Sequence, residues 1–221
     1  MGIFEWNREE FDRKLESALK EDVPYQREIY RRFFDQAKDR AIPSAVLVLF
    51  AHHQDDWGHH RTAHQSLGPS LLFIRRNDDG EIHRGQMAFP GGHCDPEDLN
   101  NAITTAVRET EEEVGVNREQ VKILGSLPTL VTTTGFAIQP IVGVYKGFME
   151  EISLKLDLSE IAETVWAPLR KLMHPDTYRC EKFSSAGIEY PIDVFQIGPY
   201  RIWGATGSIT KNLLDRLETL S

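Results

Sequence analysis

A cluster of carboxylates near the middle of the chain has the residue types and the spacing to bind a cation. It consists of Glu109, Glu111, Glu112 and Glu113. The segment is predicted to be helical because apolar residues recur at steps of three and four before Gly115, a common helix end. These apolar residues are Ile103, Ala106, Val107 and Val114. Acidic side chains at the C-terminal end of a helix repel one another and the helix dipole, at a cost of a few tenths to about 1 kcal/mol each.

The helical geometry places three of the four carboxylates together. At about 100° per residue, Glu109, Glu112 and Glu113 project within roughly one quadrant, and Glu111 points to the other side. Several anionic oxygen ligands are what a hard divalent cation such as Mg²⁺ prefers. An acidic face exposed to solvent has the same composition. The spacing alone is therefore compatible with both a metal site and a solvated face.

The residues before the helix favour the metal site. Phe89-Pro90-Gly91-Gly92 ends a predicted strand-to-loop passage, and its glycines permit close approach of the backbone to other groups. Arg108 can pair with a neighbouring acid and hold it in place. Together these residues resemble the signature of the Nudix hydrolases, G-x5-E-x7-R-E-U-x-E-E-x-G-U, in which U is apolar. The matching positions are Gly92, Arg108, Glu109, Glu112, Glu113, Gly115 and Val116.

The sequence departs from this signature at two places. Thr110 stands where an apolar residue is usual, and Asp98 stands at the first glutamate position. Nine residues instead of seven separate Asp98 from Arg108. We expect the loop that begins the helix to absorb the longer spacing.

The resemblance implies a fold, a cofactor and roles for the acidic residues. The fold would be an α/β/α sandwich around a mixed sheet, and water activated by Mg²⁺ or Mn²⁺ would attack one phosphorus of a small-molecule diphosphate. Glu112 and Glu113 would be the principal metal ligands, with Glu109 as a further ligand, while Arg108 orients a glutamate. The general base is left open between a glutamate of the signature and one from a later loop, for which the candidates are Glu160 and Glu163.

Four further segments resemble the coenzyme A pyrophosphatase branch of this family: residues 71–75, 85–92, 134–140 and 200–206. This resemblance implies hydrolysis of coenzyme A to 3′,5′-ADP and 4′-phosphopantetheine. The implied substrate-binding residues are Arg75, Arg76, His83, Arg84, Phe89, Gly91 and Gly92. Glu81 stands where the branch has an arginine, so ADP-ribose and nucleotide sugars are alternative substrates. A domain that binds a nucleotide without hydrolysing it is a third alternative.

Composition narrows the class of protein. With 221 residues, of which 40% are hydrophobic, the chain is expected to form one well-buried domain. The net charge of −9 argues against nucleic acid and anionic membranes as partners and requires cations in any phosphate site. Cys94 and Cys180 are interpreted as free thiols in a cytoplasmic protein. The sequence is compatible with a monomer and with a homodimer.

The pattern of elements is mixed α and β. We expect a helical extension over residues 1–41, with helices at 7–20 and 24–40, before the Nudix domain over 42–221. The predicted strands cover residues 45–50, 71–75, 121–124 and 139–145, with two short strands around Gly198-Pro199. A single helical turn is predicted at 159–162 and a helix at 210–220.

Five histidines lie between the first two predicted strands: His52, His53, His59, His60 and His64. Histidine clusters can bind metal. This stretch has no periodicity and contains glycine and proline, so we interpret it as a solvated loop that is dispensable for hydrolysis.

Overall fold

The protein is described by a computed structural model over residues 3–21, 23–25, 35, 39–54, 68–78, 85–185 and 188–220. Its helices are α1 (Arg8–Ala18), α3 (Ala102–Val114), α4 (Leu169–Leu172) and α5 (Gly204–Glu218). Its strands are β1 (Ile42–His52), β2 (Ser70–Arg76), β3 (Met87–Ala88), β4 (Gly91–His93), β5 (Val121–Ser126), β6 (Leu130–Val131), β7 (Phe136–Phe148), β8 (Ile161–Pro168), β9 (Tyr178–Ser185), β10 (Ile188–Ile197) and β11 (Tyr200–Ile202). Most of the helix predicted over 24–40 lies outside the described residues.

The larger sheet is mixed, as predicted. Its main path runs β3-β2-β1-β7-β5, and β4, β6 and β8 pair with β1, β7 and β2. The pairing of β1 with β7 is parallel, whereas the other pairs in this sheet are antiparallel. Within the described residues, no helix is both long and apolar enough to cross a membrane.

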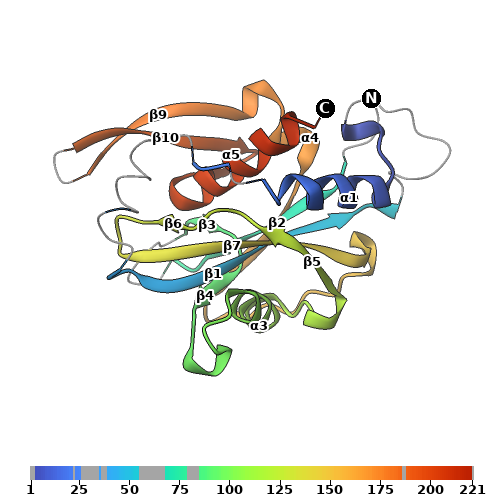
Figure 1. The fold of residues 1–221 in the computed structure, drawn as a ribbon, viewed down its shortest axis with the longest axis horizontal. Coiled ribbons are helices and arrows are strands. Elements are labelled where there is room, and N and C mark those ends of the chain that lie inside the picture. Colours follow the sequence, from blue (N-terminus) through green and yellow to red (C-terminus); the bar gives the residue numbers. More distant parts are fainter. Residues whose placement is uncertain are drawn as a thin grey trace.

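Alternating side chains of the central strands supply two separate cores. Leu47 and Leu49 of β1 pack on the side of α3, and Val48 and Phe50 pack on the side of α1 and α5. Because successive side chains in a strand point to opposite faces, an almost wholly apolar strand must be covered on both. Figure 1 shows α3 on one face of the sheet and α1 and α5 on the other. The predicted α/β/α sandwich is confirmed.

The helix predicted over 7–20 is confirmed as α1. Asn7 caps it, because its side chain accepts a hydrogen bond from the backbone N–H of Glu10 at 2.9 Å. Its apolar face, which includes Phe11 and Leu15, is buried in the same core as α5. The boundary between an extension and the Nudix domain near residue 42 stays a prediction.

Arg216 of α5 anchors the end of α1 to the opposite end of the sequence. Its buried guanidinium donates to the carbonyl oxygens of Ala18 at 3.0 Å, Glu21 at 2.7 Å and Val23 at 2.8 Å. These carbonyls lie at and beyond the C-terminal turn of α1, where backbone acceptors lack helical partners. Backbone oxygens therefore satisfy part of the hydrogen-bonding capacity of this buried cation, and its Nε donates to the side chain of Asn212 at 3.1 Å.

The second sheet is antiparallel, with the order β11-β10-β9. The two strands around Gly198-Pro199 were predicted, but β9 was not. In Figure 1 the β9–β10 ribbon lies beyond α5, away from the larger sheet. α5 begins at Gly204, six residues before the predicted start at Thr210, and Gly204 has a φ of +63°. The run of small polar residues before Thr210 concealed this earlier start.

The predicted helical turn at 159–162 is wrong. Residues 158–160 form a turn, and β8 begins directly afterwards at Ile161. The carboxylate of Asp157 accepts from the backbone N–H of Ser159 at 2.9 Å and from its hydroxyl at 2.6 Å. Such local side-chain acceptors stabilise turns at the expense of helix.

The interpretation of the histidine stretch as a solvated loop is wrong at its start. His52 ends β1, is fully buried, and its Nε2 lies 2.8 Å from the carboxylate of Asp12 in α1. His53 Nε2 lies 2.9 Å from the hydroxyl of Ser70. His52 and His53 therefore make contacts within the fold, to α1 and β2, and do not belong to a solvated loop. His59, His60 and His64 lie outside the described residues.

Candidate active site

α3 presents its acidic residues at the C-terminal end, as predicted. The side chain of Asn101 accepts from the backbone N–H of Ile103 at 3.0 Å, which begins the helix, and Gly115 ends it with a φ of +77°. The expected apolar face is only partly right, because Ile103 is exposed. The buried side is formed instead by Thr105, Ala106, Thr110, Glu113 and Val114.

The departure at Thr110 has a simple structural reason. Its side chain is buried, and its hydroxyl donates to the carbonyl oxygen of Ala106 one turn earlier at 2.7 Å. A threonine can replace an apolar residue here because the helix itself satisfies its polar atom.

Arg108 is the centre of the charged network. Its NH1 lies 3.0 Å from a carboxylate oxygen of Glu109 and 3.0 Å from one of Glu112. Its Nε and NH2 donate to the two carboxylate oxygens of Asp98 at 3.0 and 2.9 Å. These acidic groups raise the pKa of the guanidinium above its ordinary value, with the hydrogen bonds to Asp98 as the largest cause. Arg108 therefore pairs with two glutamates, Glu109 and Glu112. The resemblance implied that it orients one.

Asp98, which stands at the first glutamate position of the signature, forms a two-hydrogen-bond pair with Arg108. The carboxylate is buried and also accepts from the hydroxyl of Thr105 at 2.8 Å and from the backbone N–H of Asp95 at 3.1 Å. These donors, Arg108 first, hold the pKa of Asp98 well below its usual range. The longer spacing is absorbed before the helix, as expected. Leu99 and Asn100 both adopt the left-handed conformation there, with φ of 54° and 58°.

The paired glycines, Gly91 and Gly92, lie against the carboxylates of Glu113 and Glu109. The backbone N–H of Gly91 donates to Oε2 of Glu113 at 2.9 Å. A Cβ at Gly92 would lie 2.5 Å from the carboxyl carbon of Glu109, and one at Gly91 would lie 2.3 Å from a backbone oxygen of β1. Any larger residue would displace the carboxylate of Glu109 if placed at position 92, or the central strand β1 if placed at position 91.

Burial raises the pKa of two of these acids. The carboxyl of Glu113 is almost fully buried, and this loss of solvent raises its pKa to about 7. The negative charges of Glu109 and Glu160 raise it further, while Arg76 and the Gly91 N–H oppose the shift. Burial also raises the pKa of Glu109. Both acids thus lie where negative charge is under-compensated, which is the setting that a bound cation would relieve.

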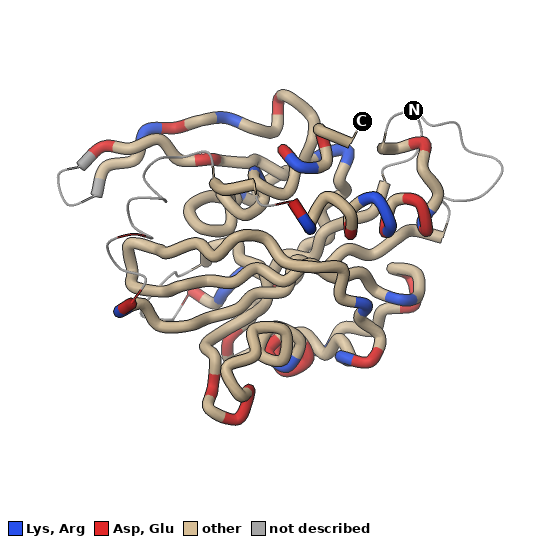
Figure 2. The backbone as a smooth tube through the Cα atoms, viewed as in Figure 1, with Lys and Arg blue, Asp and Glu red and all other residues tan. Residues whose placement is uncertain are grey.

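The donor set fits a hard divalent cation. All the side chains concerned are carboxylates, and Figure 2 shows acidic residues on α3 and on the turn before it. In the part of the chain that the structure describes, no three acidic, histidine or cysteine side chains are arranged so that together they could hold a metal ion. The reason is that Arg108 holds Glu109 and Glu112, whereas Glu113 turns to Gly91. Glu111 points away and pairs with Arg118, as expected.

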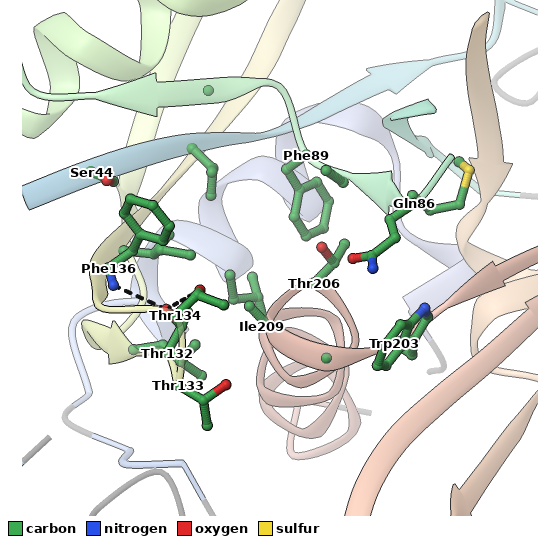
Figure 3. Close-up of a pocket in the computed structure, with 18 of the residues that line it drawn as sticks. Ser44, Gln86, Phe89, Thr132, Thr133, Thr134, Phe136, Trp203, Thr206 and Ile209 are labelled. Atoms are coloured by element: carbon green, nitrogen blue, oxygen red, sulfur yellow. Dashed lines mark hydrogen bonds between the residues drawn. The ribbon is translucent and has the colours of Figure 1, made fainter. Parts of the chain in front are cut away.

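A pocket of about 490 Å³ adjoins these carboxylates. Gly91 and Gly92 form part of its wall, so the pocket and the acidic cluster share the same short segment. Its aromatic lining residues are Phe89, Phe136, Phe183, Tyr190 and Trp203. Figure 3 shows Gln86 and Trp203 on one side of Thr206, Phe136 with Thr132–Thr134 on the other, and Phe89 above it. The volume is typical of a small-molecule site.

The predicted substrate-binding residues divide into three groups. Arg76, Phe89, Gly91 and Gly92 line the pocket. Arg75 does not line it, because its Nε donates to Glu163 at 2.6 Å. His83 and Arg84 lie outside the described residues, as does Glu81.

The two candidate bases have different surroundings. Glu163 accepts on both oxygens, from Arg75 and from the hydroxyl of Tyr200 at 2.8 Å, and these donors lower its pKa. Glu160 is exposed, and its charge reaches the buried carboxyl of Glu113. Of the two, Glu160 alone is shown to influence the acidic cluster.

Sequence reasoning missed most of the pocket. Phe183 and Tyr190 come from β9 and β10, and Thr132 and Thr206 come from a loop and from α5. Each is an ordinary residue of its element, and the β9–β10 register that sets Tyr190 opposite Phe183 leaves no short-range pattern. The one available signal was the resemblance around 134–140 and 200–206.

The match of a family model assigns this chain to a family. The NUDIX domain model matches residues 61–183, more than half of the chain. The chain belongs to the Nudix hydrolase family. It is therefore a hydrolase of diphosphate linkages, and enzymes of this family use divalent cations.

Several relatives named Nudix hydrolase NudL align with about two thirds of this chain. An uncharacterized Nudix hydrolase NudL from Photorhabdus laumondii is 33% identical over 150 residues, which cover 68% of this chain and 78% of the relative. Its counterpart from Yersinia enterocolitica is 34% identical, covering 68% and 75%. Among solved structures, a MutT/nudix family protein from Enterococcus faecalis is similar, with a TM-score of 0.49 and 16% identity over 97% of this chain and 75% of that one.

Proposed function

We propose that this Nudix hydrolase cleaves the diphosphate of coenzyme A or a close derivative to 3′,5′-ADP and 4′-phosphopantetheine. One observation carries the substrate assignment. Of the four segments that resemble the coenzyme A branch, three contribute to the wall of the same pocket, at residues 86–92, 134–138 and 203–206. Segments so far apart in sequence have no local reason to share a wall, so their convergence supports a common ligand.

We propose Mg²⁺ or Mn²⁺ as the cation, held by Glu109, Glu112 and Glu113. When bound, the cation would activate water and neutralise charge on the phosphate oxygens. The residues of this chain have defined tasks around it. Arg108, anchored on Asp98, keeps Glu109 and Glu112 in place, and Gly91 orients Glu113 through its backbone N–H.

Arg76 is the proposed cationic contact for the diphosphate. It lines the pocket, and its NH2 lies 3.9 Å from Glu113 and 3.5 Å from the carbonyl oxygen of Gly91. It therefore lies where pocket and carboxylates meet. Arg75 is a weaker candidate because Glu163 already engages it.

Glu160 is the proposed general base among the later glutamates. Its exposed carboxylate is free of the two hydrogen bonds that hold Glu163, and it contributes to the raised pKa of Glu113. A base needs an accessible lone pair, which the partners of Glu163 occupy. A glutamate of α3 remains the alternative base.

The test is a comparison of catalytic efficiency on coenzyme A, dephospho-coenzyme A, ADP-ribose and GDP-mannose, each with Mg²⁺ and with Mn²⁺. We expect coenzyme A to be preferred. Loss of the 3′-phosphate removes a charge-assisted contact worth roughly 1.5–3 kcal/mol, or ten- to a hundred-fold in kcat/KM. A tenfold preference for ADP-ribose or GDP-mannose would overturn the substrate assignment. An absence of turnover on the whole panel would favour a binding domain.

A further inference from the structure

The pocket next to the acidic cluster differs from it in charge. Among the described residues that line it, Arg76 is the one with a permanent charge, and no aspartate or glutamate is present. Arg76 lies at the carboxylate end, 3.9 Å from Glu113. The lining also includes the imidazole of His93, whose Nδ1 lies 3.4 Å from the hydroxyl of Ser44. The rest of the wall is apolar or carries hydroxyl and amide groups, as at Thr206 and Gln86 (Figure 3).

The aromatic part of the wall is built from side chains that support one another. The ring of Phe183 lies 5.4 Å from that of Trp203 and 5.7 Å from that of Tyr190, measured between centroids. These residues come from β9, β10 and the start of α5, so the second sheet contributes to the wall of the same pocket as Gly91 and Gly92. Rigid aromatic walls bury apolar groups at little entropic cost.

We infer that this pocket binds the uncharged pantetheine arm of the substrate, and that the 3′-phosphorylated nucleoside lies outside it. This inference rests on the proposed function. The two halves of coenzyme A differ in charge: the nucleoside half carries a phosphate dianion, and the pantetheine arm carries methyl, hydroxyl, amide and thiol groups. A buried charge needs a partner, whereas the arm matches apolar walls with scattered polar groups.

Besides Arg76, the N-terminus of α5 favours an anion in this wall, because Gly204–Thr206 lie in it. The rival occupant is therefore the nucleoside half with its 3′-phosphate. The two product-like halves, pantetheine and 3′,5′-ADP, separate these assignments without any need for turnover.

The deciding variant is Thr206→Phe, which fills the pocket from α5. The matched control is Thr104→Phe, at a half-buried helical position of α3 that does not line the pocket. Binding is followed by tryptophan fluorescence, with Trp203 as the reporter in the wall and Trp203→Phe to assign the signal. Circular dichroism and thermal unfolding establish that each variant is folded.

We expect saturable binding of pantetheine that Thr206→Phe weakens at least tenfold and Thr104→Phe leaves unchanged. KM for coenzyme A should rise at least tenfold in Thr206→Phe, whereas KM for ADP-ribose, which lacks the arm, should change less than threefold. If 3′,5′-ADP binds and is displaced by Thr206→Phe while pantetheine does not bind, the inference is overturned. An equal rise in KM for both substrates overturns it as well.

The two proposals fail in different ways. If coenzyme A is not hydrolysed but pantetheine binds and Thr206→Phe abolishes the binding, the substrate assignment falls and the pocket assignment stands. If coenzyme A is hydrolysed and Thr206→Phe leaves its KM unchanged, the pocket assignment falls and the substrate assignment stands.

Discussion

The two ends of the active-site region are constructed in opposite ways. The charged end consists of Gly91, Gly92, Asp98 and the glutamates of α3, which lie within a short stretch of sequence. The neutral end draws on residues from β3, the loop before β7, β9, β10 and α5. Chemistry is thus encoded locally, while recognition depends on how distant elements pack. Each end should respond to mutation in its own way.

Loss of a carboxylate at the charged end should have the largest effect. We expect Glu112→Gln to lower kcat by about 10²–10³, equivalent to about 2.7–4 kcal/mol, because it deletes an anionic ligand at nearly constant size. The control is Glu111→Gln on the other side of the same helix, where Glu111 pairs with Arg118. Steady-state assays with EDTA-treated, Mg²⁺-restored protein measure both. Near-normal turnover of Glu112→Gln would remove Glu112 from the metal site.

The pH dependence of stability should also originate at this end. In metal-free protein, the free energy of unfolding should fall as pH rises from 4.5 towards about 7, because folding raises the pKa of Glu113 over this range. The unfolded chain then binds fewer protons than the folded one, and the full effect is roughly 3 kcal/mol. Urea unfolding in EDTA measures the slope.

The matched variants for this slope are Glu113→Gln, which should flatten it, and Glu97→Gln at an exposed position, which should retain it. If Glu113→Gln keeps the wild-type slope, another group is responsible for the pH dependence of the free energy of unfolding.

Removal of the Asp98 carboxylate, which anchors Arg108, should lower the stability of the fold more than it changes substrate binding. Asp98→Asn should lower the free energy of unfolding by about 2 kcal/mol, since a buried carboxylate with four donors is lost. Asp95→Asn, whose exposed carboxylate lies 3.2 Å from Arg108, should cost about 0.5 kcal/mol.

The difference between wild type and Asp98→Asn should shrink in acid. The folded-state pKa of Asp98 is lowered, so its stabilisation is present above its ordinary pKa and is lost as pH falls through the lowered value. Denaturant titrations at several acidic pH values measure this. A constant difference would show that Asp98 acts through shape instead of charge.

The histidine stretch should have the smallest effect on catalysis. Replacement of residues 55–67 by a short Gly-Ser segment, with His52 and His53 retained, should leave turnover within a few-fold. His52→Ala should lower the melting temperature instead, because it breaks the buried contact with Asp12. The contrary outcome is a loss of activity in the loop variant, together with a rescue by Zn²⁺ that occurs in the unmodified protein and not in the variant. The histidine stretch would then be a third functional region besides the two ends.

The extent of successful prediction follows the same division. The central strands, α1, α3 and the orientation of Glu111 could be predicted, because periodicity and helix ends are local signals. Helical geometry correctly grouped Glu109 with its neighbours, but it could not show that Arg108 holds two of the acids while Gly91 takes the third. β9 and the early start of α5 were missed, since tertiary packing outweighed weak local preference there. The environments of Arg75 and Glu163 depended on a contact across three strands, which no spacing reveals.

The hydrogen bonds between Arg216 and the end of α1 have a consequence for folding during synthesis. Contacts that join Ala18 to Arg216 span 198 positions in sequence, so a ribosome exposes α1 long before its anchor exists. Phe11 can pack against Phe50 once β1 has emerged, but the end of α1 lacks the guanidinium of Arg216 until α5 has emerged. Closure of this core is therefore a late event in biogenesis, and newly made chains halted before residue 216 should be the ones that chaperones retain.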